Sequence, residues 1–134
     1  MIRVEETGGV RVVTIDRPAK RNALTPEMLS ELRTAVGEAT TPVVHLTGTE
    51  GVFSAGADFE TVAAAAKTSS AETFIRHGQE TMTAIADAES VVVAGVDGPA
   101  RGGGVELALA CDIRVATSSA TFAETGVKLG LFGA

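Results

Sequence analysis

The residues best suited to chemistry form a glycine run that ends in a carboxylate, at Gly102–Glu106 (Gly-Gly-Gly-Val-Glu). The run follows a continuous apolar stretch, Val91–Val96, and leads into a helix-like segment, Leu107–Ala110. Glycine is unfavourable in such a place unless the backbone must approach another group or adopt a positive φ angle. Backbone N–H groups at a helix N-terminus can stabilise an oxyanion, and Glu106 beside them can carry a proton. The run therefore predicts a site for acid–base chemistry on an anionic intermediate.

A second turn of small residues, Ser54–Asp58 (Ser-Ala-Gly-Ala-Asp), follows another apolar stretch, Val43–Thr47. Two such turns could bring two backbone N–H groups to one point. Taken alone, this turn is ordinary, and Asp58 is expected to cap the helix that follows.

Two earlier motifs complete a pattern that spans most of the chain. Arg17–Pro18 and Asn22–Leu24 precede the two turns, and the whole pattern runs from Ile15 to Gly130. In this order and spacing the sequence resembles the crotonase (enoyl-CoA hydratase/isomerase) superfamily. The combination is specific, whereas either glycine turn alone would be a weak signal.

The resemblance implies that the protein binds acyl-CoA or enoyl-CoA thioesters and stabilises an enolate at the thioester oxygen. The N–H groups of Ala55 and Gly103 would form the oxyanion hole, and Glu106 would act as acid or base. Coenzyme A would enter as part of the substrate, without a metal ion or redox cofactor.

The resemblance also implies contacts with the coenzyme. Its path would be lined by Gly103 and by the backbone of Ala55, Gly56, Ala57 and Asp58. Lys20 would meet the coenzyme phosphates, although an exposed basic loop without a ligand explains Lys20 equally well.

A second catalytic glutamate, which hydratases of this family use, is missing at its expected position. By the family pattern it would lie four residues after Phe122, where this chain has Gly126. Glu124 lies two residues earlier, which along a strand moves a carboxylate by about 6–7 Å, too far for a hydrogen bond to the same group. Glu124 is therefore expected to be a poor substitute and an ordinary surface glutamate. Three alternatives stay open: an isomerase with Glu106 alone, a hydratase with an unusual second acid, or an inactive or non-catalytic acyl-CoA-binding relative.

Composition limits the partners. The 134 residues suit one domain, residues 1–134, and a hydrophobic content of 45% is sufficient for a core. The net charge of −6 argues against a nucleic-acid partner and against attraction to an anionic membrane. No apolar stretch reaches the ~18 residues of a membrane span, so a cytoplasmic location is expected. The single cysteine, Cys111, is expected to be a buried packing residue.

The order of predicted elements indicates an α/β protein with right-handed crossovers. Thr25 and Pro26 predict the start of the first helix, as cap and first helical residue. Strands are expected at 2–5, 10–15, 43–47, 91–96, 113–116 and 120–122, and helices at 26–36, 59–67, 71–88 and 104–111. The 91–96 strand is expected to be buried on both faces.

The resemblance adds an arrangement that periodicity does not give, namely a spiral of ββα units with two roughly perpendicular sheets. It also implies that the chain is the N-terminal part of one acyl-CoA-binding domain. The C-terminal helical region, which would cover the acyl group and build a homotrimer or hexamer, is expected to be missing.

Overall fold

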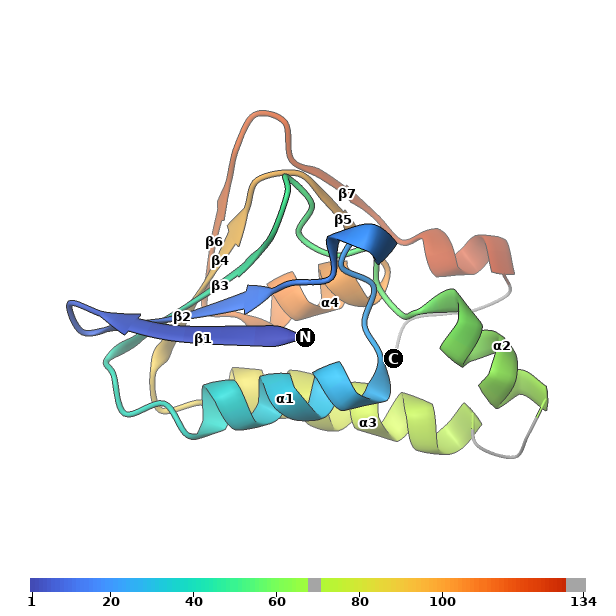
Figure 1. Ribbon diagram of the computed structural model, residues 1–134, viewed down its shortest axis with the longest axis horizontal. Helices are drawn as coiled ribbons and strands as arrows, with labels where there is room; N and C mark the ends of the chain where they lie inside the picture. Colours follow the sequence, from blue (N-terminus) through green and yellow to red (C-terminus); the bar gives the residue numbers. More distant parts are fainter. Residues whose placement is uncertain (68–70, 130–134) are drawn as a thin grey trace.

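A computed structural model describes residues 1–67 and 71–129. Its main sheet has five strands in the order β1 (Ile2–Thr7), β2 (Val10–Ile15), β3 (Val43–Gly48), β4 (Val91–Val96) and β6 (Ile113–Ala116) (Figure 1). The first pair is antiparallel and the other three pairs are parallel. A second, two-stranded parallel sheet pairs β5 (Pro99–Arg101) with β7 (Thr121–Ala123). The predicted α/β class is therefore confirmed.

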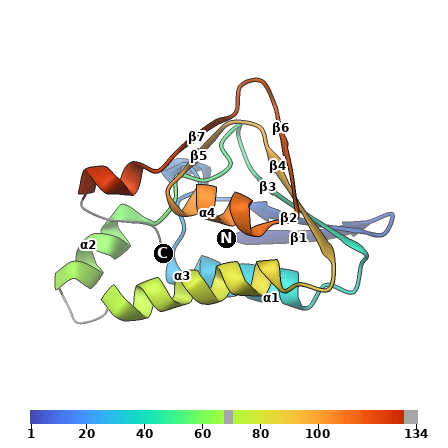
Figure 2. The ribbon, with the colours of Figure 1, turned by 180° about the vertical axis from the view of Figure 1, so that it is seen from behind.

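The helices are α1 (Pro26–Gly37), α2 (Phe59–Lys67), α3 (Ala71–Ala86) and α4 (Gly103–Ala110), with short 3₁₀ helices η1 (Pro18–Lys20) and η2 (Thr125–Leu129). Both ribbon views place α1 and α3 side by side (Figures 1 and 2). Helix α4 lies between this helix pair and the two-stranded sheet. None of the described helices is both long and apolar enough to cross a membrane.

Local signals in the sequence account for the first half of the fold. The hairpin between β1 and β2 turns at Gly8 and Gly9, whose φ angles of +54° and +80° favour glycine. Helix α1 begins as predicted, with the Thr25 hydroxyl accepting a hydrogen bond from the Met28 N–H at 3.3 Å.

The core lies between one face of the main sheet and helices α1, α3 and α4. Its largest fully buried side chains include Phe53, Ile15, Leu32, Leu46, Ile85 and Leu107. The prediction for 91–96 is wrong in one respect, because burial alternates along β4. Val92, Ala94 and Val96 are buried, but Val91 is 44% exposed. The reason is that these helices pack on only one face of the sheet.

Two segments after β4 also differ from expectation. Pro99–Arg101 form strand β5, which is not among the strands expected from the sequence. Residues 125–129 form the 3₁₀ helix η2, whereas an extended strand was expected between Glu124 and Gly126. Residues 68–70, which separate the predicted helices 59–67 and 71–88, lie outside the described residues.

Candidate active site

The two small-residue turns meet in space, and glycine is what permits the contact. A Cβ atom placed on Gly56 would lie 2.5 Å from the carbonyl oxygen of Arg101, and Gly56 also has a φ of +84°. A Cβ atom on Gly104 would lie 2.6 Å from the carbonyl oxygen of Ser54. The Arg101 N–H donates to this same Ser54 oxygen at 2.9 Å. A side chain at either glycine would therefore push the turns apart.

Three of the four backbone N–H groups in the turn at 55–58 donate hydrogen bonds to other groups of the protein. The N–H groups of Ala55, Gly56 and Asp58 donate to Arg21 O at 3.0 Å, Ser54 Oγ at 3.1 Å and Leu24 O at 2.8 Å, respectively. Within residues 1–67 and 71–129, the N–H of Ala57 has no acceptor. Ala57 is thus the one residue of this turn whose amide is available to a ligand.

The hydrogen bonds of this turn argue against Ala55 as an oxyanion donor. Its N–H is already committed to the carbonyl of Arg21, a neighbour that the local sequence pattern does not reveal. Ala57, expected only to line the coenzyme path, has the free amide and lies closer to the glycine run. A Cβ atom placed on Gly103 would be 3.7 Å from the Ala57 nitrogen.

Helix α4 supplies the other half of the site. Its N-cap residue, Gly102, has a φ of +47°, and its N–H donates to the carbonyl of Ala123 at 3.0 Å. Gly103 is the first helical residue, so its N–H has no acceptor within the helix and points out of the helix N-terminus. The partial positive charge of the helix dipole is concentrated at this end. An anion beside Gly103 would therefore be stabilised.

Glu106 lies in the first turn of α4, half-buried, with its carboxylate close to Gly103. A Cβ atom on Gly103 would lie 3.8 Å from a Glu106 carboxylate oxygen. The space beside Gly103 therefore adjoins both the Ala57 amide and this carboxylate. The arrangement can hold a negative oxygen and move a proton nearby.

Glu124 interacts electrostatically with Glu106, an interaction that is not expected from the sequence. Glu124 is an exposed residue, but partial desolvation of its carboxyl group raises its pKa, and the negative charge of Glu106 raises it further. Glu124 follows Ala123, whose carbonyl is bonded to Gly102 at the start of α4. From here the chain enters η2 and rises only about 2 Å per residue, so the strand-based separation does not apply. Residue 126 is glycine, so it supplies no carboxylate at the position expected for the second glutamate.

Asp58 has the structural role expected from the sequence. Its carboxylate accepts the Thr61 N–H at 3.0 Å, which caps α2, and forms an ion pair with Arg17 at 2.6 Å. Burial acts to raise the pKa of Asp58, but hydrogen bonds from Arg17 and Thr61 outweigh this effect, so the pKa is lowered. The carboxylate therefore ties the Arg17 loop to the start of α2.

Two other predicted residues are placed as follows. Lys20 is exposed and forms an ion pair with Glu60 at 3.0 Å, so its contact with coenzyme phosphates stays a prediction. Cys111 is buried, its thiol donates to Leu107 O at 3.2 Å, and burial raises its pKa to about 12. The expected packing role of Cys111 is confirmed.

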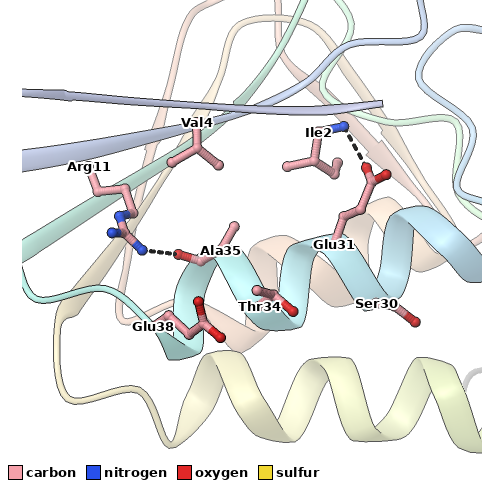
Figure 3. A pocket seen from close by; sticks show the side chains of 8 residues that line it. All are labelled: Ile2, Val4, Arg11, Ser30, Glu31, Thr34, Ala35 and Glu38. Atoms are coloured by element: carbon pink, nitrogen blue, oxygen red, sulfur yellow. Dashed lines mark hydrogen bonds between the residues drawn. The ribbon is translucent and has the colours of Figure 1, made fainter.

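An open pocket of about 520 Å³ lies elsewhere, between the β1–β2 hairpin and α1 (Figure 3). Two hydrogen bonds join residues that line it: the Ile2 N–H donates to the Glu31 carboxylate at 2.8 Å, and the Arg11 guanidinium donates to Ala35 O at 3.1 Å. It shares no residue with the glycine turns, so it is not part of the candidate active site.

The fold and the paired turns define an α/β protein of the crotonase type. Its structure superposes with a TM-score of 0.92 on an enoyl-CoA hydratase/isomerase family protein from Hyphomonas neptunium, at 31% identity, covering 99% of this chain and 53% of that one. The family model described as enoyl-CoA hydratase/isomerase matches residues 5–134. The chain belongs to the enoyl-CoA hydratase/isomerase family.

Curated relatives show a similar extent of likeness. The chain is 38% identical over 133 residues to a short-chain-enoyl-CoA hydratase of Clostridium acetobutylicum, covering 96% of this chain and 51% of the relative. It is 33% identical over 138 residues to 4-chlorobenzoyl coenzyme A dehalogenase-2 of an Arthrobacter species, covering 97% and 50%. The chain thus spans about half the length of the curated relatives it matches.

Proposed function

We propose that the whole protein converts enoyl-CoA thioesters, by hydration or double-bond isomerisation, through an enolate held at the start of α4. The N–H groups of Ala57 and Gly103 would bind the thioester oxygen, and Glu106 would carry the proton. The observation that supports this most strongly is the free N–H of Ala57, whose nitrogen would lie 3.7 Å from a Cβ atom placed on Gly103. Family membership supports the substrate class.

One carboxylate is sufficient for isomerisation of a 3-enoyl thioester. Glu106 would take a proton from the α-carbon, and the electron pair would delocalise onto the thioester oxygen, where the two amides stabilise it. The same group would return the proton at the γ-carbon, which moves the double bond. Each preorganised donor of this kind typically contributes about 2.7–4 kcal/mol to lowering the barrier.

Hydration requires a second proton-transfer group. One group must accept a proton from the water that adds to the β-carbon, while another delivers a proton to the α-carbon. Glu124 is the carboxylate that interacts with Glu106, and we propose it as the second group. Hydration is therefore compatible with this site although position 126 is glycine.

The substitution Glu106→Gln tests the proposal in the full-length protein. We expect loss of crotonyl-CoA hydration and 3-enoyl-CoA isomerisation, with thioester binding retained in calorimetry, because glutamine keeps the shape but carries no transferable proton. Glu38→Gln, on an exposed residue after α1, is the matched control and should keep full activity. Unchanged turnover in Glu106→Gln would rule out the mechanism.

A second candidate function is acyl-CoA binding without turnover, which Gly126 favours because it removes one expected carboxylate. Calorimetric binding of coenzyme A thioesters by a wild-type protein that neither hydrates nor isomerises them would support this alternative. Turnover of either kind would exclude it.

A further inference from the structure

A buried polar cluster lies directly behind the Ala57 amide. Its central residue, Asn22, is fully buried and adopts a φ of +57°, a left-handed conformation that asparagine tolerates better than most residues. The side chain of Asn22 accepts the Arg17 N–H at 2.9 Å and donates to Thr49 O at 3.1 Å and Val52 O at 2.7 Å. Asn22 therefore fixes its own segment to the loop at residues 49–52, which is distant in sequence.

Ser54 connects this cluster to the turn that carries Ala57. Its buried hydroxyl donates to the Asn22 carbonyl at 2.9 Å and accepts the Gly56 N–H at 3.1 Å. Its carbonyl accepts the Arg101 N–H at 2.9 Å, next to the glycine run. Ser54 thus touches both halves of the candidate site through three different hydrogen bonds.

The peptide that contains the Ala57 N–H is oriented from the same segment. The carbonyl of Gly56 accepts the Leu24 N–H at 2.8 Å. In a planar trans peptide the C=O and the following N–H point in opposite directions. Because the Gly56 carbonyl faces Leu24, the Ala57 N–H must face away from the 22–24 segment.

We propose that Asn22 and Ser54 are positioning residues that aim the Ala57 amide at the space beside Gly103. This inference rests on the proposed function, because it assigns a purpose to a donor that the function uses. Neither side chain touches the substrate. Their effect passes through the Gly56 N–H and through the anchored 22–24 segment.

The variant Ser54→Ala tests the inference in the full-length protein, with Ser90→Ala as a matched control. Both serines are buried and both donate to a carbonyl, since the Ser90 hydroxyl donates to Thr41 O at 2.7 Å, but Ser90 is remote from the turns. We expect kcat to fall by about tenfold or more in Ser54→Ala with little change in KM, because misaligned oxyanion donors weaken mainly transition-state binding. Ser90→Ala should keep the wild-type kcat. Equal losses in both variants, or none in Ser54→Ala, would overturn the inference.

A second readout does not depend on turnover. The amide ¹H and ¹⁵N chemical shifts of Ala57 in the unliganded protein should change in Ser54→Ala and stay constant in Ser90→Ala. An unchanged Ala57 resonance in Ser54→Ala would overturn the positioning role. If the wild-type protein is inactive on enoyl-CoA thioesters while Ala57 shifts as expected, the proposed function fails and the positioning role stands.

Discussion

At the scale of single residues, adjacent glycines in one run have different reasons to be glycine. Gly104 lies against the carbonyl of Ser54, where a Cβ atom would be 2.6 Å away. Gly103 has room for a Cβ atom at ordinary van der Waals distances, but that atom would occupy the space between the Ala57 amide and Glu106. Gly104 is therefore required by packing, whereas we propose that Gly103 keeps a ligand site open.

The pair Gly103→Ala and Gly104→Ala separates these two roles. We expect Gly104→Ala to lower the free energy of unfolding by about 1–3 kcal/mol, as overpacking does. Gly103→Ala should change it by less than about 1 kcal/mol, because alanine suits a helix at least as well as glycine, yet turnover should be lost. Urea unfolding and enoyl-CoA assays measure both. Retained activity in Gly103→Ala would contradict the assignment of this glycine.

The donor assignment shows what residue types alone could and could not predict. The glycine run, Glu106 and the second turn were identified from composition and spacing. The choice between Ala55 and Ala57 was not, because it depends on which amides find acceptors in the distant 21–24 segment. Only the folded chain shows that Arg21 takes the Ala55 N–H.

At the scale of elements, local signals predicted most helices and strands well. The Thr25 cap and the spacing of apolar residues define α1, and a continuous apolar run defines β4. The extent of burial on each face of β4 depends on where helices pack, which periodicity does not reveal. The 3₁₀ helix η2 was not predicted. The interaction of Glu124 with Glu106 was not predicted either, because it depends on two segments that are distant in sequence.

The interaction between α4 and the end of β7 predicts a linked titration. Because the Glu106 charge raises the pKa of Glu124, Glu106→Gln should lower the pKa of Glu124 towards its ordinary value of 4.5, leaving only the increase due to partial desolvation. Carboxyl ¹³C NMR titration measures this shift. Glu38→Gln serves again as the control. A Glu124 titration that is identical in wild type and Glu106→Gln would show that the two carboxylates do not interact.

At the scale of the whole molecule, the described chain leaves large apolar side chains exposed near its C-terminal half. They include Leu109, Ile113, Val115, Phe122 and Val127. By strand register, Ile113 and Val115 lie beside Val93 and Gly95 on the same face of the main sheet. An apolar surface of this kind favours association.

The 134-residue chain on its own is therefore expected to self-associate. Sedimentation velocity should show a sedimentation coefficient that rises with protein concentration, and the double variant Ile113→Thr/Val115→Thr should reduce this rise because it makes the exposed strand more polar. Thr7→Ser, on the distant hairpin, is the control. A concentration-independent monomer in the wild-type chain would contradict this expectation. The trimer or hexamer expected for the whole protein stays a separate prediction.

The central claim is that the amides of Ala57 and Gly103 polarise a thioester carbonyl. Infrared spectroscopy of a ¹³C=O-labelled enoyl-CoA bound to the full-length protein tests it most directly, because hydrogen bonds to the oxygen lower the C=O stretching frequency. We predict a shift to lower frequency in the wild-type complex and a much smaller shift with Gly103→Ala, provided that both proteins bind the thioester. A bound carbonyl with the same frequency as in water, or one insensitive to Gly103→Ala, would contradict the claim.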